Sequence, residues 1–230
     1  MRTTVLSTIA FAFLALAASA EERRGPRPPE LRVTGNATVP AAPDQAQVDV
    51  AVISQARTAA EAAAQNAAAT EKVLGALRGT GAAVQTLGYG VRPDYRTPKP
   101  GGRPEIAGYT ASNTVRATTD DLAEVGGLID RATGAGASEI RGLRFMLKDE
   151  EPVRREALAL AAVRARAKAD AIAEALGTRV VGVRRVEEGG GSVPVARHRA
   201  MAMEASVATP VEAGDVEVRA TVSLTVEIAP

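Results

Sequence analysis

Cysteine and tryptophan are absent from the 230 residues of this chain, and histidine occurs once. Without cysteine the fold has no disulfides, and no thiol nucleophile or cysteine-ligated metal site is available. A single histidine also excludes a zinc-binding HExxH helix. Aromatic residues make up 3%, which argues against platforms that stack bases or sugars. The hydrophobic residues, 46% of the chain, are enough for a sizeable core, and because few of them are aromatic this core must be built from Ala, Val, Leu and Ile.

A strong charge of one sign is missing too, because 28 basic residues face 27 acidic ones and the net charge is +1. No long-range field therefore draws the chain toward nucleic acids or anionic membranes. We expect no nucleic-acid partner.

The long apolar run of this chain lies at its N-terminus. Arg2, an apolar stretch over 5–17 and Ala18-Ser19-Ala20 predict a signal peptide over residues 1–20. The run is shorter than the roughly 20 residues of a membrane-spanning helix, and no second candidate follows. We expect an exported, periplasmic mature chain with no membrane-spanning segment. A retained N-terminal anchor is the alternative.

Hydrophobic periodicity predicts the elements of the mature chain. Strands are predicted over 31–39, 45–52, 84–95, 106–118, 140–147, 180–187 and 216–228, and helices over 58–78, from Asp120 or Asp121 to about 134–136, and over 150–177. The order β-β-α-β-β-α-β-α-β-β predicts an α+β fold, a largely antiparallel sheet with three helices packed on it.

The helix predicted over 150–177 organises this fold. Pro152 suits a first helical turn, and Gly177 suits a left-handed C-terminal cap. One charge-free face carries Leu158, Ala161, Ala162, Ala165, Ala169, Ile172 and Leu176. Because this face is mostly alanine, we expect the helix to approach a β-sheet closely.

The helix over 58–78 opens with a capping box, Thr58 to Glu61. Its predicted inner face carries Ala63, Ala67, Leu74 and Leu77, with Asn66 and Thr70 on the same side. Asn66 could face a ligand, but a buried asparagine more often bonds to neighbouring backbone.

Three stretches have the composition of flexible segments. Residues 21–30 are charged and proline-rich and predict a disordered leader, which leaves one domain over 31–230. A Pro- and Gly-rich loop spans 97–104, and residues 188–214 predict a flexible insertion. The sequence assigns no role to the loop or the insertion.

The search for chemistry yields no catalytic, cofactor-binding or metal-binding residue. His198 lies in the predicted insertion, where a catalytic base could not be held in place. The pair Asp120-Asp121 is interpreted as a helix cap rather than a metal site, and Lys148 to Glu151 as a charged turn.

Several phrases together resemble the SIMPL-domain proteins of bacterial envelopes. They are Val33-Thr-Gly-Asn-Ala37 with Val39-Pro and Pro43-Asp44, Gly108-Tyr109-Thr-Ala-Ser-Asn113, Gly136-Ala-Ser with Gly142-Leu-Arg-Phe145, the helix from Glu156 to Gly177, and Thr209-Pro210-Val-Glu-Ala-Gly214. The resemblance implies a periplasmic or outer-membrane-associated protein linked to stress tolerance, without an established catalytic motif and with ring-forming oligomers among its relatives.

Three functions follow as hypotheses. The first is a non-enzymatic envelope protein that acts by self-assembly or by contacts with envelope proteins. The second is a periplasmic small-ligand-binding protein, with Tyr89, Tyr95 and Tyr109 lining a pocket. The third is an enzyme that uses carboxylates, lysine and tyrosine.

The last strand supports the first hypothesis. Val216 to Ile228 alternates strictly and contains no proline, so if this strand, or the first one, lies at a sheet edge, it would invite pairing with another chain. We expect a homo-oligomer formed partly by strand edges. The alternative is a monomer whose closing strand is central and paired on both sides.

Overall fold

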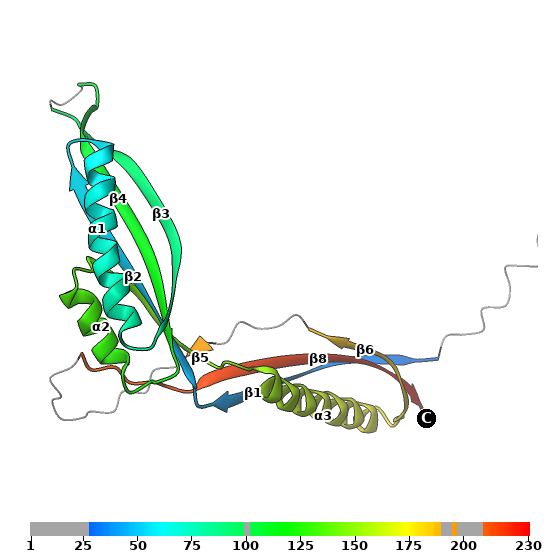
Figure 1. Cartoon of the computed structure of the whole chain (residues 1–230). Helices are drawn as coiled ribbons and strands as arrows, with labels where there is room; N and C mark the ends of the chain where they lie inside the picture. The colour runs from blue at the N-terminus through cyan, green and yellow to red at the C-terminus, as the bar shows by residue number, and fades with distance from the viewer. Residues whose placement is uncertain (1–27, 99–101, 190–194, 197–208) are drawn as a thin grey trace, which may run out of the picture. The chain divides into compact units, whose positions relative to one another are not determined.

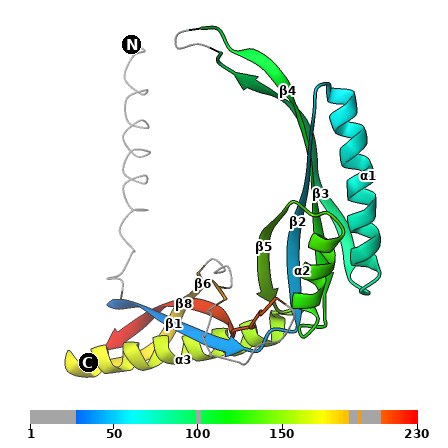
Figure 2. The same cartoon turned by 90° about the vertical axis from the view of Figure 1, so that its left-hand side faces the viewer.

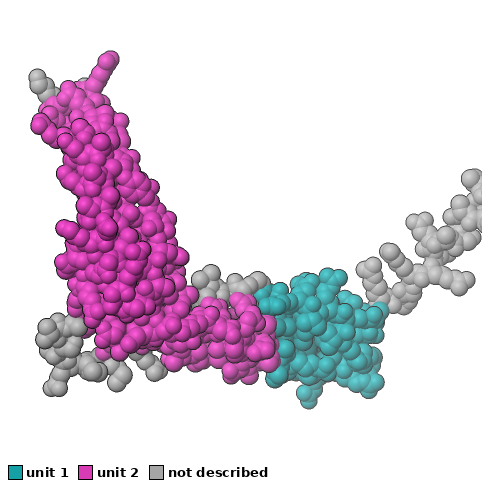
Figure 3. All heavy atoms as spheres, in the orientation of Figure 1, with its two compact units in different colours: residues 1–36, 161–189, 221–230 teal, residues 37–160, 190–220 magenta. Residues whose placement is uncertain are grey.

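The computed structural model of this chain describes residues 28–98, 102–189, 195–196 and 209–230. The predicted signal peptide over 1–20, most of the leader over 21–30 and much of the insertion over 188–214, with His198, lie outside these residues. The chain divides into two compact units (Figure 3). Unit 1 comprises residues 1–36, 161–189 and 221–230, and unit 2 comprises residues 37–160 and 190–220.

The elements follow the predicted order, and the fold is α+β with two antiparallel sheets and three helices in the described residues (Figure 1). They are β1 (Glu30–Ala41), β2 (Gln45–Ala56), α1 (Ala59–Arg78), β3 (Ala83–Arg96), β4 (Glu105–Thr119), α2 (Val125–Gly134), β5 (Glu139–Met146), α3 (Glu151–Ala175), β6 (Arg179–Glu188), β7 (Val195–Ala196) and β8 (Val216–Ala229). The two-residue strand β7, which pairs with β8, is the one element that the periodicity did not predict.

Unit 2 is built on a four-stranded sheet in the order β3-β4-β2-β5. Helices α1 and α2 cover one face of this sheet (Figure 2). The alternating residues Val48, Val50 and Val52 of β2 point into the core with at most 1% exposure. They pack with Leu77 of α1 and Leu128 of α2. The apolar alternation of the sequence thus matches the face that the helices bury.

Helix α1 begins as predicted, because both hydrogen bonds of the Thr58–Glu61 capping box are present. Its buried face agrees with the predicted one at Asn66, Thr70 and Leu77 and differs from it elsewhere. The buried residues are Ala62, Asn66, Thr70, Val73 and Leu77, whereas Ala67 is exposed. The stripe was misplaced because most of the first turns are alanine, so hydropathy alone does not orient the helix.

The predicted cap of the second helix is wrong. Helix α2 begins at Val125, and its N-cap Glu124 makes no side-chain capping bond. The Asp121 carboxylate instead accepts a hydrogen bond from the Ala123 N–H, at 3.1 Å, in a turn before the helix. Asp120 is bound to Lys148 and Gln45.

Unit 1 holds α3, from Ala161 onward, against parts of a sheet ordered β1-β8-β6. Buried side chains of β8, including Val222, Leu224 and Val226, form the apolar face of this sheet. The close approach of α3 to the sheet occurs at Gly35 of β1. A Cβ atom on Gly35 would lie 2.1 Å from the Ala161 carbonyl oxygen and 2.4 Å from the Ala165 nitrogen.

The buried stripe of α3 consists of alanines spaced four residues apart. They are Ala157, Ala161, Ala165, Ala169 and Ala173. The prediction that an alanine-rich face allows a close approach is confirmed, but Leu176, assigned to that face, is 65% exposed. Larger side chains are displaced to the flanks because the main chains of helix and strand nearly touch.

The closing strand β8 is not an edge strand. It lies between β1 and β6, so the alternative of a central closing strand holds, and it is the first strand, β1, that lies at an edge. Its strict alternation reflects burial on one face of a central strand. The edges of this sheet are β1 and β6, and those of the unit 2 sheet are β3 and β5.

Candidate functional site

Asp120, one of the residues that the sequence analysis considered as a metal ligand, has structural partners. In the part of the chain that the structure describes, no group of three or more His, Asp or Glu residues could hold a metal ion. Asp120 forms an ion pair with Lys148 at 2.6 Å and accepts a hydrogen bond from Gln45 at 3.0 Å. The Lys148 hydrogen bond, followed by that of Gln45, lowers the pKa of Asp120. Asp120 therefore joins β2, β4 and the turn before α3 as a structural anion.

Asn66 is fully buried and bonds to backbone, as the second interpretation predicted. Its Nδ2 donates to the carbonyl oxygens of Val52, at 2.8 Å, and Ala111, at 3.2 Å. Its Oδ1 accepts from Thr70 at 3.4 Å. The amide links α1 to the two central strands and is not available to a ligand.

A second ion pair lies within the unit 2 sheet. Arg116 of β4 donates two hydrogen bonds to the Asp49 carboxylate of β2, at 2.6 and 2.7 Å. These bonds lower the pKa of Asp49 against the opposing effect of burial. The two residues are paired across the strands, so the bridge reinforces their register.

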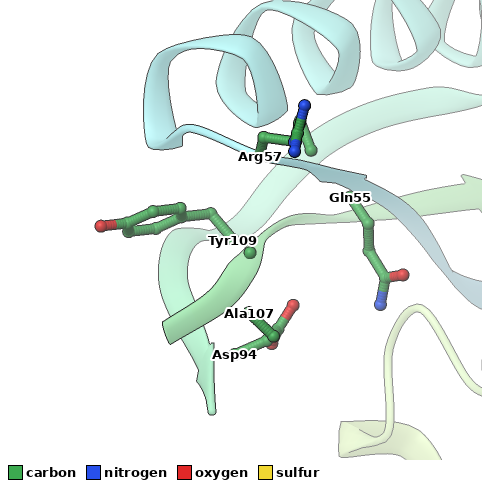
Figure 4. A pocket seen from close by; sticks show the side chains of 7 residues that line it. Gln55, Arg57, Asp94, Ala107 and Tyr109 are labelled. Carbon is green, nitrogen blue, oxygen red and sulfur yellow. The ribbon is translucent and has the colours of Figure 1, made fainter. Parts of the chain in front are cut away.

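One hollow lies at the end of unit 2 where β2 leads into α1. It has a volume of about 450 Å³ and is an open depression (Figure 4). Its lining residues are Gln55, Ala56, Arg57, Asp94, Ala107, Gly108 and Tyr109. We call it the β2–α1 hollow. Its lining includes a guanidinium, a carboxylate, an amide and a phenol.

Strand pairing positions these side chains. Ala56 of β2 is opposite Tyr109 of β4, and Asp94 of β3 is opposite Gly108. A Cβ atom on Gly108 would lie 2.9 Å from the Ala56 carbonyl oxygen, so glycine allows β2 and β4 to stay close here. Thr110, 3% exposed, donates a hydrogen bond to Asp94 Oδ2 at 2.5 Å. The Thr110 hydroxyl therefore orients the carboxylate of Asp94.

Of the three tyrosines proposed to line a pocket, Tyr109 lines the hollow, whereas Tyr89 and Tyr95 do not. Sequence reasoning missed Gln55, Arg57 and Asp94. Only the strand register could have indicated them, because it places the end of β2 beside the ends of the β3–β4 hairpin.

Exposed apolar side chains form a second kind of candidate site. Five large ones belong to the β3–β4 hairpin, and we call them the hairpin patch: Leu87, Tyr89, Val91, Tyr95 and Ile106. Tyr89 and Tyr95 are 56% and 62% exposed. On β6 of unit 1, Val181, Val183 and Val186 are also exposed.

The strand edges are protected against added strands. The Ile228 N–H donates to the Pro29 carbonyl, so by alternation the carbonyls of Thr34 and Asn36 point away from β8. Lys168 donates to the Thr34 oxygen at 2.6 Å, and Arg164 to the Asn36 oxygen at 2.9 Å. These cations from α3 occupy acceptors that another strand would need.

The other long edge strands are irregular. Strand β3 has a bulge between Thr86 and Gly88 and includes Pro93, which has no N–H. Strand β6 has two register shifts within ten residues. Bulges and proline interrupt strand addition, so contacts with other chains should depend on side chains.

No helix among the described residues has the length and apolar character needed to cross a membrane.

Comparisons with known proteins agree with the resemblance. A family model described as "SIMPL: Protein of unknown function (DUF541)" matches residues 31–226. A "26 kDa periplasmic immunogenic protein" of Brucella melitensis is 30% identical over 98% of this chain and 94% of the relative, and so is that of Brucella abortus. The "Uncharacterized protein YggE" of Edwardsiella ictaluri is 29% identical over 77% of this chain and 75% of the relative.

Proposed function

Since this chain belongs to the SIMPL family, we propose that it is a non-enzymatic protein of the bacterial envelope that acts by self-assembly and protein contacts. It is exported to the periplasm by its N-terminal signal peptide. Its partners are other copies of itself and envelope proteins, including those of the outer membrane. Its role is tolerance of envelope or oxidative stress, as the family resemblance implies.

Two observations support the location and the absence of a reaction. The Brucella relatives are named periplasmic proteins, and the names of the three relatives state no reaction. Among the described residues, the strongly bound carboxylates have structural partners, as Asp49 and Asp120 do.

The hairpin patch carries the proposal of assembly. Large apolar side chains that gather on one surface mark interaction sites, whereas single exposed ones need no explanation. Leu87, Tyr89 and Val91 follow one another on the outer strand β3, and Tyr95 and Ile106 continue the patch along the hairpin. Because the edges are interrupted or capped, a second copy would meet these side chains rather than extend the sheet.

Light scattering on the purified protein across micromolar concentrations tests this proposal. We expect a defined mass above that of a monomer, and a shift toward the monomer for Tyr89→Thr with Val91→Thr. Val163→Thr on the exposed side of α3 is the matched control and should leave the mass unchanged. A monodisperse wild-type monomer would rule out self-assembly.

A second candidate function is the binding of a small ligand in the periplasm. The β2–α1 hollow favours it, because the ring of Tyr109 and the polar side chains of Gln55, Arg57 and Asp94 all line it. A thermal shift assay with periplasmic metabolites tests it. A compound that raises the melting temperature of wild type, but not of Gln55→Ala, would support binding in the hollow.

A further inference from the structure

We propose that the β2–α1 hollow binds a short zwitterionic peptide of dipeptide size, with the peptide carboxylate on Arg57 and its ammonium group on Asp94. This inference rests on the second candidate function, the binding of a small ligand. It adds the chemical class of the ligand and the residues that recognise it.

The first step is that the hollow holds two opposite charges that do not neutralise each other. No ion pair within 4.0 Å involves Arg57 or Asp94 in the portion of the chain that is described, although both line the same depression (Figure 4). Two such groups facing one hollow match a molecule that carries both charges. A ligand with a single charge would leave one of them unmatched.

The second step concerns the orientation of Asp94. The buried Thr110 hydroxyl donates to Oδ2, and the other carboxylate oxygen accepts no hydrogen bond from the described residues. Thr110 thus acts as a positioning residue, and Oδ1 is left to accept a hydrogen bond from an ammonium group. The position of Arg57 is set by its neighbours in the chain, because it lies between the last residue of β2 and Thr58, the capping residue of α1.

The third step is size and lining. A volume of about 450 Å³ lies within the roughly 300–1,000 Å³ range of small-molecule sites, and the hollow is open enough to leave part of a ligand in water. The lining residues Ala56, Ala107 and Gly108 are small, so they leave most of the hollow open to a ligand. The Gln55 side chain offers both a donor and an acceptor, which suits the amide of a peptide bond. The ring of Tyr109 offers an apolar contact to a side chain of the bound peptide.

These features favour a dipeptide over other small metabolites. A phosphate ester would bring two negative charges to a single arginine and would be repelled by Asp94. A polyamine would be repelled by Arg57. A dipeptide satisfies both charges at its ends and the amide between them.

Isothermal titration calorimetry of the purified full chain with L-alanyl-L-leucine tests the proposal. Two blocked forms of this peptide are titrated in the same way, one with an acetylated N-terminus and one with an amidated C-terminus. We expect saturable binding of the free peptide and about tenfold weaker binding of each blocked form, which corresponds to about 1.4 kcal/mol.

Two nearly isosteric variants assign the ends of the ligand. Arg57→Gln should weaken the free peptide about tenfold but not weaken the amidated peptide further. Asp94→Asn should weaken the free peptide but not the acetylated one. The matched controls Arg92→Gln and Glu71→Gln lie outside the hollow lining and should bind as wild type does.

Absence of saturable binding at millimolar peptide, or equal affinity of wild type, Arg57→Gln and Asp94→Asn, would overturn the proposal. If another metabolite raises the melting temperature of wild type but not of Gln55→Ala, ligand binding stands while the peptide proposal fails. Thermal unfolding of each variant shows that the changes leave the fold intact.

Discussion

Gly35 and Ala165 are in such close contact that a single methyl group would separate them. A Cβ atom at position 35 would lie 2.4 Å from the Ala165 nitrogen and 2.9 Å from its Cα atom. These neighbours are main-chain atoms of a helix, so they cannot move aside as a flexible side chain could. The contact fixes how near α3 can come to β1.

Gly35→Ala is therefore expected to reduce the free energy of unfolding by about 1–3 kcal/mol or more through overpacking. Urea denaturation followed by circular dichroism measures the change. Gly75→Ala is the matched control, because Gly75 is an exposed position of α1 with nothing near its Cβ direction. It should raise stability by about 0.5–1 kcal/mol. Equal effects of the two variants would contradict the close contact.

Ala165→Glu tests the buried stripe of α3. A carboxylate at this fully buried position would lack a partner and space, so we expect a loss of several kcal/mol, on the order of 3 or more. Ala167→Glu adds the same group on the exposed side of the same helix and should be nearly neutral. Melting temperatures within a few degrees of each other would show that the buried face is misassigned.

These two positions also show what could be predicted from sequence. The run of small residues in α3 indicated a close approach, because an alanine face lets the helix main chain come near the neighbouring sheet. It did not orient the helix fully, and Leu176 was placed inside although it lies outside. In α1 the same ambiguity rotated the buried face, since alanines occur on every side.

Strand alternation was more informative than the helical stripes. Val48, Val50 and Val52 identified the inner face of β2, because period two leaves no rotational freedom. Alternation says nothing about neighbours, so it left open whether β8 is an edge strand or, as the structure has it, a central one. The β2–α1 hollow was missed for a similar reason. Arg57 and Asp94 are 37 positions apart in the printed sequence, and only the β2–β4–β3 register brings their strands together.

Asn66→Ala should lower the free energy of unfolding by about 1–3 kcal/mol. The substitution removes the donors to the Val52 and Ala111 carbonyls and leaves the Thr70 hydroxyl without its acceptor. Chemical denaturation measures the loss, and Gln65→Ala on the exposed side of α1 is the control. A neutral Asn66→Ala would mean that the amide does not hold α1 to the sheet.

The Asp49–Arg116 pair predicts a pH dependence. The Arg116 hydrogen bond lowers the pKa of Asp49 in the folded protein below its ordinary value. The stability from this pair is therefore fully present above the unfolded pKa, about 4, and is lost as pH falls through the lowered folded pKa. We expect wild type to exceed Asp49→Asn in free energy of unfolding at pH 7, with the difference shrinking below about pH 4. A difference independent of pH would contradict the ionic origin.

The cations that cap β1 predict an effect on association. Lys168→Ala with Arg164→Ala exposes the carbonyls of Thr34 and Asn36, so larger species than those of wild type should form in light scattering as concentration rises. Arg155→Ala with Arg166→Ala removes the same charge from the same helix and should not have this effect. If both pairs behave alike, net charge rather than edge capping controls association.

The alanine stripe of α3 also restricts how this chain can evolve. A single-base change in an alanine codon yields Gly, Ser, Thr, Pro, Val, Asp or Glu, and of these only glycine is smaller. At Ala161 and Ala165, where the helix main chain lies against β1, most point mutations therefore enlarge a side chain that has no room to grow. Inherited variation is consequently pushed to the outer surfaces, the same surfaces through which other molecules would be recognised. The outer surfaces can thus vary while the buried face of α3 stays almost the same.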